Sequence, residues 1–220
     1  MTEEPLTAPE RSIARTPRWL IYTVIVLLGA LLAMAVYLSL ANRAGPGTAR
    51  STGQQEIAEL REALRQSPDD TAVQLELAYA YQQAGRLSEA LDLYDRVLAV
   101  FPTQTAALYG KGSVLLALGD SKGAERVLWE VLEINEGHVL AAQTLGEMYA
   151  GWGHYRSLIK AVRPAVVLNE SSAELQFLMG LAYENLGQRE WAEARYRLAL
   201  EHYPDMPQAR AGLERLGAVP

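Results

Sequence analysis

Hydrophobic and polar positions divide the 220-residue chain into two unlike parts. The first is an uninterrupted apolar run from Trp19 to Leu40, WLIYTVIVLLGALLAMAVYLSL, which contains no charged residue. A helix of this length covers about 33 Å, enough for a hydrocarbon core of about 30 Å. The run therefore predicts one membrane-spanning helix over residues 19–41, in contact with the lipid bilayer through residues 19–40.

The flanks of this run predict how it sits in the membrane. The run exceeds the ~7–15 apolar residues of a cleavable signal sequence, which favours an uncleaved signal anchor over cleavage at Ser39-Leu40-Ala41. Three arginines precede the run and two follow it: Arg11, Arg15 and Arg18, then Arg43 and Arg50. This imbalance favours a single-pass protein of the inner (cytoplasmic) membrane with a cytoplasmic N-terminus and an extracytoplasmic remainder. We expect residues 1–18 to be a disordered tail.

The second part begins after a polar stretch. Residues 42–53, NRAGPGTARSTG, are rich in Gly, Ser and Thr, which predicts a flexible linker. Beyond it, small and large apolar residues recur every 34 positions, with glycines at 85, 119, 153 and 187 as the clearest series. Three further series share the register: Ala78, Gly112, Gly146 and Gly180; Tyr81, Leu115, Tyr149 and Tyr183; and Tyr94, Leu128, Val162 and Tyr196.

This 34-residue unit resembles the tetratricopeptide repeat family, a helix–turn–helix repeat. The resemblance is strongest in TAVQLELAYAYQQAGRLSEALDLYDRVLAVFPTQ and AELQFLMGLAYENLGQREWAEARYRLALEHYPDM. It implies an all-α, right-handed solenoid over residues 54–216, preceded by the single N-terminal transmembrane helix. The expected parts are an opening helix at 54–67, repeats at 71–104, 105–138, 139–172 and 173–206, and a closing helix at 208–216.

Two residues depart from the repeat pattern. Lys111 occupies a position that is apolar in the other repeats, and Pro164 falls inside the second helix of the third repeat. Because proline lacks an amide hydrogen and crowds the carbonyl four residues earlier, we expect a kink or an early stop in the helix that begins near Tyr155.

Composition narrows the chemistry. The chain has no cysteine, which excludes disulfides, thiolate metal sites and a cysteine nucleophile. Residues 54–220 carry 15 basic and 23 acidic residues, an acidic balance that argues against nucleic acid as a partner. The three histidines, His138, His154 and His202, share no metal-ligand spacing. The run Gly110-Lys111-Gly112-Ser113 lacks the spacing and context of a phosphate loop. We therefore expect no catalytic residues, no metal, no cofactor and no enzyme activity.

The resemblance also implies a binding surface. In this family the first helix of each repeat lines a concave groove, and one pair of positions per repeat points into it. Here these are Leu75 and Tyr79, Tyr109 and Ser113, Gln143 and Glu147, and Phe177 and Leu181. The Lys, Asn and Arg with which some members hold a terminal carboxylate are missing. The groove is apolar and aromatic at both ends, which favours a protein or peptide segment as the partner; the alternative is that these side chains pack on one another.

Two functional classes follow. The first is a membrane-anchored scaffold or assembly factor that binds a segment of a partner protein in the groove. Its layout resembles the repeat subunits of bacterial cytochrome c maturation systems and membrane-anchored periplasmic chaperones. The second is a structural subunit of a membrane complex, or a homo-oligomer, that turns over no client.

Overall fold

The computed structural model describes residues 34–35, 38 and 47–218, and within them it is entirely helical where it has regular structure. The chain divides into two units, Met1–Gln54 and Gln55–Pro220. The helices are α2 (Gly47–Gln66), α3 (Thr71–Gln83), α4 (Leu87–Val100), α5 (Thr105–Ala117), α6 (Ser121–Ile134), α7 (Val139–Gly151), α8 (Tyr155–Leu168), α9 (Ala173–Asn185), α10 (Arg189–His202) and α11 (Pro207–Arg215). The all-α expectation is confirmed.

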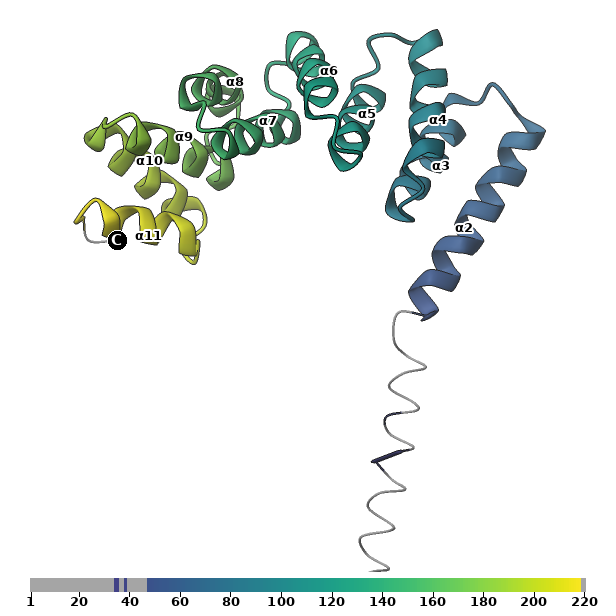
Figure 1. Cartoon of the computed structure of the whole chain (residues 1–220), viewed down its shortest axis with the longest axis horizontal. Coiled ribbons are helices and arrows are strands. Elements are labelled where there is room, and N and C mark those ends of the chain that lie inside the picture. The colour runs from purple at the N-terminus through teal and green to yellow at the C-terminus, as the bar shows by residue number, and fades with distance from the viewer. Residues whose placement is uncertain (1–33, 36–37, 39–46, 219–220) are drawn as a thin grey trace, which may run out of the picture. The chain divides into compact units, whose positions relative to one another are not determined.

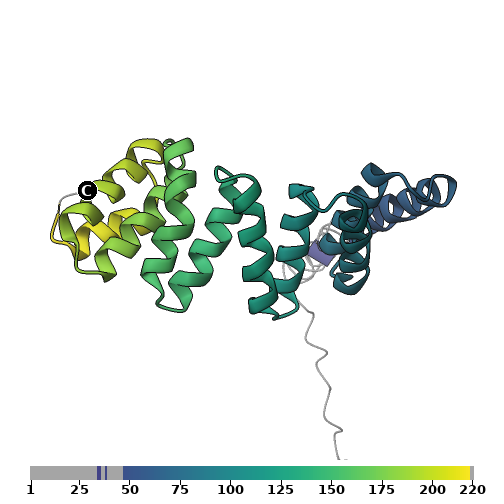
Figure 2. The same ribbon diagram turned by 90° about the horizontal axis from the view of Figure 1, so that it is seen from above.

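Each repeat is a pair of antiparallel helices, here named helix A and helix B. The first repeat holds α3 and α4, the second α5 and α6, the third α7 and α8, and the fourth α9 and α10. In the second unit, neighbouring helices from α5 to α10 stand side by side in a row (Figure 2). Helices α5 and α7 lie on the inner side of the arc of this unit, and α6 and α8 lie on its outer side (Figure 1).

Local sequence sets the ends of these helices. Asp70 accepts hydrogen bonds from the amides of Ala72 and Val73 and so caps α3, and Asp120 caps α6 in the same way. Two residues after the end of each helix A comes a glycine with positive φ, namely Gly85 (74°), Gly119 (85°), Gly153 (72°) and Gly187 (73°). The 34-residue glycine series therefore marks the left-handed turns between helices A and B, a conformation that costs little only for glycine.

Two of the other series meet in the core. A Cβ atom built on Gly112 would lie 3.0 Å from Leu128, one on Gly146 would lie 2.9 Å from Val162, and one on Gly180 would lie 2.7 Å from Tyr196. The small residue of helix A is thus required because the large residue of helix B packs directly onto it. Burial of these side chains in a continuous apolar core is what holds the stack together.

Helix α2 corrects the expected linker. It begins at Gly47, directly after Pro46, so positions 47–53 are helical although the composition of 42–53 predicted a flexible linker. The free-energy cost of extending a helix is small once its C-terminal half is fixed, because each added residue brings one hydrogen bond without a new nucleation step. Here Ile57, Leu60 and Leu64 fix that half by packing against the first repeat.

The third repeat corrects the expectation for Pro164. Helix α8 runs from Tyr155 to Leu168 with the proline inside it, so the predicted early stop is wrong. An internal proline costs about 3 kcal/mol. Four buried residues on both sides of it, Ala161, Val162, Ala165 and Val166, oppose that cost by anchoring the helix in the core.

Glutamates stand at both ends of the stack. In α2, Glu56 and Glu59 are exposed at positions where α4 has the buried residues Ala90 and Leu93, 34 residues on. In α11, Glu214 is exposed at the place of the small residues that let helix B approach, such as Gly180. A further helix at either end would bury a carboxylate without a partner, so the stack is closed at both ends.

The predicted membrane span lies outside the described residues, apart from Met34, Ala35 and Leu38. Among the residues that are described, no helix is long and apolar enough to cross a membrane. The expected tail at 1–18 also falls outside them.

Candidate functional site

The eight predicted groove residues come from the four A helices of the second unit. Leu75 and Tyr79 lie on α3, Tyr109 and Ser113 on α5, Gln143 and Glu147 on α7, and Phe177 and Leu181 on α9. Because the two members of each pair are four residues apart, they share one helical face. We call this set of side chains the inner groove. Its members differ in exposure, and that difference separates side chains available to a partner from side chains that pack within the protein.

The α3 end of the inner groove is open and uncharged. Tyr79 is 59% exposed and Leu75 is half-buried. Leu75 also lines a hollow of about 460 Å³, the first-repeat hollow, together with Thr71, Ala72, Phe101, Thr103 and Gln104. Phe101, which directly follows α4, is 50% exposed. Two aromatic rings and an aliphatic side chain therefore remain accessible here with no charged residue lining the hollow.

Sequence reasoning missed Phe101. It follows the last residue of a B helix, so it lies outside the A-helix positions at which the family resemblance implies groove residues. A comparison of repeats would have found it, because the equivalent positions hold Asn135, Asn169 and Tyr203. The two middle repeats have Asn at this position, so an aromatic residue there in the first repeat indicates a contact specific to that repeat.

The second repeat closes the place that is hollow in the first. Tyr109, the counterpart of Leu75, lies against His138 with ring centroids 5.4 Å apart. His138 is fixed in turn because its Nδ1 accepts a hydrogen bond from the amide of Ala141 at the start of α7, 3.2 Å away. Tyr109 is half-buried as a result, so its ring serves packing between repeats as well as the groove surface.

The middle of the inner groove is polar. The Gln143 side-chain amide donates to a carboxylate oxygen of Glu147 over 2.9 Å, and Glu147 is exposed. Ser113 is half-buried beside this pair along the row of A helices. Glu147 is the one charged member of the inner groove, so a partner's backbone amides or a basic side chain suit this section best.

The α9 end is apolar but more enclosed than the α3 end. The ring of Phe177 lies 5.9 Å from the ring of the buried Tyr196, and Phe177 and Leu181 are both half-buried. The aromatic character predicted for both ends is therefore available to a partner chiefly at the α3 end, where Tyr79 makes no such ring contact among the described residues.

The remaining polar clusters have structural roles. The Trp129 indole donates to the Tyr149 hydroxyl over 2.8 Å, and this hydroxyl donates to Glu125. Burial, followed by the hydrogen bond to Glu125, raises the pKa of Tyr149 to about 12, so the phenol stays protonated. Over the described ranges no group of three or more His, Asp or Glu side chains converges to hold a metal ion.

Lys111 likewise serves structure. Its ammonium lies 2.5 Å from a carboxylate oxygen of Asp95 on the preceding B helix. Gly110 and Gly112 on either side of it lie inside α5 against Tyr94 and Leu128. These glycines permit close helix packing, in a place where no loop could wrap a phosphate.

Comparison with known proteins identifies the family. Two family models described as tetratricopeptide repeat match the chain, one over residues 57–112 and 83–147 and the other over residues 174–205. Together the matches cover more than half of the chain. The chain belongs to the tetratricopeptide repeat family.

Individual relatives agree with this assignment. The human protein O-mannosyl-transferase TMTC1 is 26% identical over 166 residues, which are 73% of this chain. The chain spans only 19% of the length of that protein, so the likeness concerns its repeats.

Solved structures show the same fold. MamA is 22% identical and superposes with a TM-score of 0.62 over 71% of this chain and 92% of its own. YrrB, described as a tetratricopeptide repeat protein with an unusual peptide-binding site, is 20% identical, with a TM-score of 0.59 over 71% and 90% of the two chains. The helical solenoid and a role in protein–protein interaction follow from the family.

Proposed function

We propose that this protein is a membrane-anchored scaffold that binds a segment of a partner protein in its inner groove. The observation that carries the proposal is the open α3 end. Phe101 is 50% exposed and lines the first-repeat hollow, and Tyr79 is 59% exposed on the same helix as the hollow residue Leu75. Accessible aromatic rings next to an apolar hollow are typical anchors for a protein partner.

The lining of the hollow defines the kind of segment that fits. Its polar groups are the hydroxyls of Thr71 and Thr103 and the amide of Gln104, and its floor is Leu75 and Phe101. An aliphatic or aromatic side chain of the partner would enter it, while the polar rim would pair with the partner's backbone. The neighbouring Gln143–Glu147 pair would then select for backbone donors or a basic residue further along the segment.

The apolar run at 19–40 would hold this groove at the membrane surface. Anchoring raises the effective concentration of the groove toward other membrane-bound proteins, so that a weak groove suffices. We place the protein in the inner membrane with the repeats outside the cytoplasm, as the arginines around the run favour. Presentation of apocytochrome in cytochrome c maturation and a periplasmic chaperone role are the two processes that this layout suits.

A homo-oligomer built by stacking the ends of the solenoid is less favoured. Joining α11 of one copy to α2 of another would bring Glu214 and Glu56 to the positions where helices A and B cross most closely in the other repeats. Two carboxylates there would repel each other and lose water. The structural-subunit alternative would therefore need a different surface.

Site-specific crosslinking tests the groove. A photoreactive residue in place of Tyr79, expressed in the native membrane, should capture a partner that mass spectrometry identifies. Substituting Phe101→Ala should then reduce the captured partner at least fivefold, about 1 kcal/mol of binding. Tyr203→Ala is the matched control, because Tyr203 occupies the equivalent position in the fourth repeat and is similarly exposed, at 48%. Equal capture by wild type and Phe101→Ala, or equal losses in both variants, would overturn the proposed anchor.

Protease treatment of spheroplasts tests the anchor and its orientation. The repeats should be cleaved in intact spheroplasts if they lie outside the cytoplasm. Full protection there, with cleavage only after lysis, would overturn the orientation. Release of the protein from membranes by carbonate washing would overturn the anchor itself.

A further inference from the structure

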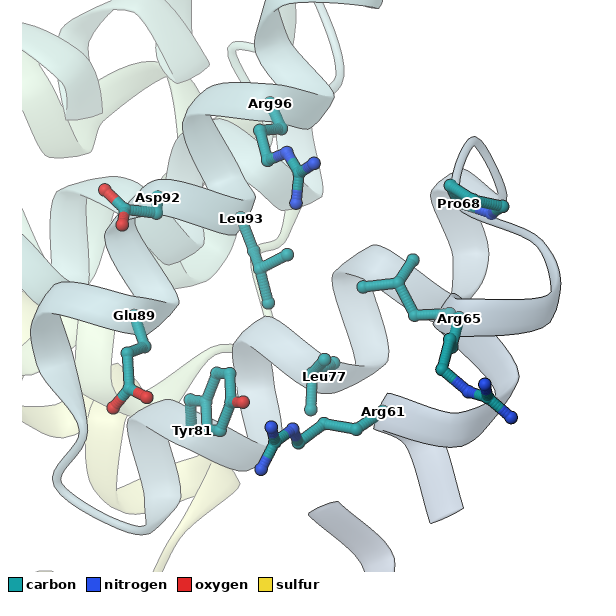
Figure 3. Close-up of a pocket in the computed structure, with 10 residues that line it drawn as sticks. Arg61, Arg65, Pro68, Leu77, Tyr81, Glu89, Asp92, Leu93 and Arg96 are labelled. Carbon is teal, nitrogen blue, oxygen red and sulfur yellow. The ribbon is translucent and has the colours of Figure 1, made fainter. Parts of the chain in front are cut away.

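A second set of recesses lies away from the inner groove, between consecutive B helices. We call each of them a B-helix cleft: two B helices form its walls and the intervening A helix forms its floor. The cleft of the first repeat is about 490 Å³ and is shown in Figure 3. In this view Arg61 and Arg65 from α2 lie on one side of the apolar floor of Leu77 and Tyr81, and Arg96 from α4 lies above it. Glu89 and Asp92 from α4 line the other side.

The fourth repeat has the equivalent cleft, larger, at about 1000 Å³. Most of the residues that line the first cleft have a counterpart 102 positions later, three repeat lengths of 34, so that Arg163 corresponds to Arg61 and Tyr183 to Tyr81. Both clefts thus place an arginine of the preceding B helix over an apolar floor that contains a tyrosine.

In the second repeat the protein fills this cleft itself. The position of Arg61 is taken by Asp95, and the position of the floor residue Leu77 is taken by Lys111. The two side chains pair, with 2.5 Å between the ammonium and a carboxylate oxygen. A side chain of opposite charge therefore enters the second cleft and neutralises the residue on its wall.

In the third repeat the equivalent wall residue also has an internal cationic partner. Trp129 occupies the position of Arg61, and the ammonium of Lys160 lies 5.1 Å from the centre of its ring. The recess beside it is the smallest of the three, at about 310 Å³. The middle repeats thus satisfy this wall position from within the chain.

In the first and fourth repeats, the arginine at this wall position has no ion-pair partner among the described residues. Among the described residues, no carboxylate lies within 4.0 Å of the guanidinium of Arg61 or Arg163, and the floor residues beneath them are Leu77 and Met179. By the pattern of the second repeat, the complementary occupant is a carboxylate. Glu89 of α4 lies close enough to Arg61 for a Coulombic attraction, but it is itself paired with Arg86, and no described carboxylate forms an ion pair with Arg61 or Arg163. Arginine is well suited to this role because its planar group binds a carboxylate through two parallel hydrogen bonds.

We propose that these two clefts bind an acidic segment of a partner protein in which an aspartate or glutamate lies next to an apolar side chain. The carboxylate would pair with Arg163 or Arg61, and the apolar side chain would cover the floor. At the fourth-repeat cleft, Val167 is 66% exposed and offers apolar surface to such a side chain.

The fourth cleft contains a second guanidinium, that of Arg195, whose direction is fixed by hydrogen bonds. Arg195 donates to the side-chain oxygen of Gln176 over 2.9 Å, and the Gln176 amide donates to the Glu170 carbonyl over 2.9 Å. Gln176 is only 2% exposed, so this pair fixes the direction of Arg195. The clefts also contain carboxylates, Glu170 and Glu201 in the fourth repeat and Glu89 and Asp92 in the first. Because these carboxylates repel further negative charge, a polyacidic segment is disfavoured.

An array of capped nine-residue peptides tests the clefts with the full chain in detergent micelles. The central residues should be Leu-Glu-Phe, Leu-Gln-Phe or Leu-Lys-Phe, with varied flanking residues. We expect the Glu series to bind at least tenfold better than the other two, and Arg61→Gln/Arg163→Gln to remove that preference. The matched control is Arg126→Gln/Arg156→Gln, which removes two exposed arginines outside both clefts.

The outcomes separate this proposal from the groove. A Glu preference that is lost with the cleft arginines, and kept in Phe101→Ala and in the control, supports the clefts whatever the groove does. No preference for Glu over Gln across the array would overturn the proposal, as would a preference that survives in Arg61→Gln/Arg163→Gln. Circular dichroism of each variant confirms the fold, which exposed Arg→Gln changes should leave intact.

Discussion

The first and fourth repeats differ from the second and third in how helix B packs against the following helix A. In the first and fourth, the large residue of helix B is a tyrosine, Tyr94 or Tyr196, and the following A helix has glycine sixteen positions later, Gly110 or Gly212. A Cβ atom on Gly212 would lie 2.5 Å from the Tyr196 ring, so the ring occupies the space of the missing side chain.

The middle repeats reverse the sizes. Leu128 and Val162 replace the tyrosines, and the positions sixteen residues later hold Thr144 and Leu178. Leu178 reaches over to Gly146 of the preceding A helix, where an added Cβ would lie 2.9 Å from it. A large side chain on helix B is thus matched by a small one on the next helix A, and the reverse holds in the middle repeats. The packing of one repeat is therefore defined only together with its neighbour.

Introducing the residues of the middle repeats at the equivalent positions 94 and 110 should give the largest change in the free energy of unfolding. Gly110→Thr alone inserts a side chain against Tyr94 and should destabilise the protein by about 3 kcal/mol through overpacking. Adding Tyr94→Leu transfers the Leu128/Thr144 pair of the second and third repeats and should recover more than half of the loss, as measured by urea unfolding followed by circular dichroism.

A matched change in the middle supplies the control. Thr144→Gly should cost only about 1 kcal/mol, the helix penalty of glycine, because no tyrosine occupies the adjoining space. Strict additivity of Gly110→Thr and Tyr94→Leu would contradict the exchange of volume, since coupled neighbours give non-additive changes.

The two tyrosine repeats differ in the partner of the phenol, and this difference should give the next largest effect. Tyr196 donates to Glu184, which also accepts two hydrogen bonds from Arg215, whereas Tyr94 donates to the neutral Gln82. Glu184→Gln gives the fourth repeat the amide of the first and should cost about 1.5 kcal/mol, because charge-assisted hydrogen bonds are lost.

The pH dependence of that cost identifies its origin. Hydrogen bonding to Arg215 holds the pKa of Glu184 below its ordinary value of 4.5. A depressed folded-state pKa contributes stability above pH 4.5 that disappears as the pH falls through the folded-state value. The difference in unfolding free energy between wild type and Glu184→Gln should therefore shrink below pH 4.5, and a difference that stays constant would contradict the role of the carboxylate.

Alkaline pH should destabilise the first repeat through Tyr94. Burial raises its pKa from 10.0 to about 12, so the unfolded phenol ionises before the folded one. The stabilisation is complete below pH 10 and is lost as the pH rises from 10 to 12. In Tyr94→Phe the loss of stability over this window should be smaller by about 1 kcal/mol for each pH unit, as measured by urea unfolding at each pH. An identical decline in both proteins would show that other groups account for it.

Lys111 gives the smallest expected effect. Lys111→Leu places at this position the residue that the first and third repeats have, Leu77 and Leu145. Lys111 is partly buried and Asp95 is half exposed, so apolar burial should offset the lost ion pair and change stability by less than about 1 kcal/mol. A loss above about 2 kcal/mol would mean that the ion pair specifies the packing of the second repeat.

The sequence was sufficient for the features that repeat. Gly85 and its counterparts, and the series of Ala78 and Tyr81, follow from a period that every unit obeys, because each unit meets the same backbone geometry. The helical start of α2 at Gly47 was missed because it depends on the anchored half of that helix, and composition reports only intrinsic preference.

The candidate site was less predictable for a related reason. The positions of Tyr79 and Glu147 in the inner groove are implied by the resemblance to the repeat family, but their exposure depends on which side chains the neighbouring helices place beside them. Tyr109 is partly covered by His138, and Phe177 lies against Tyr196, contacts between positions that no local pattern links. The exposure of a groove side chain is therefore set by contacts between helices, which the spacing of residues along one helix does not predict.

The glutamates at the two ends of the stack, Glu56 and Glu214, also determine where the protein can change its length. A 34-residue unit inserted between Gln104 and Thr105 would meet a compatible A or B helix on each side. The same unit appended after Leu216 would have to pack a helix B onto Glu214. Duplication or deletion of repeats in this solenoid is therefore confined to its interior, while helices α2 and α11 remain at its two ends.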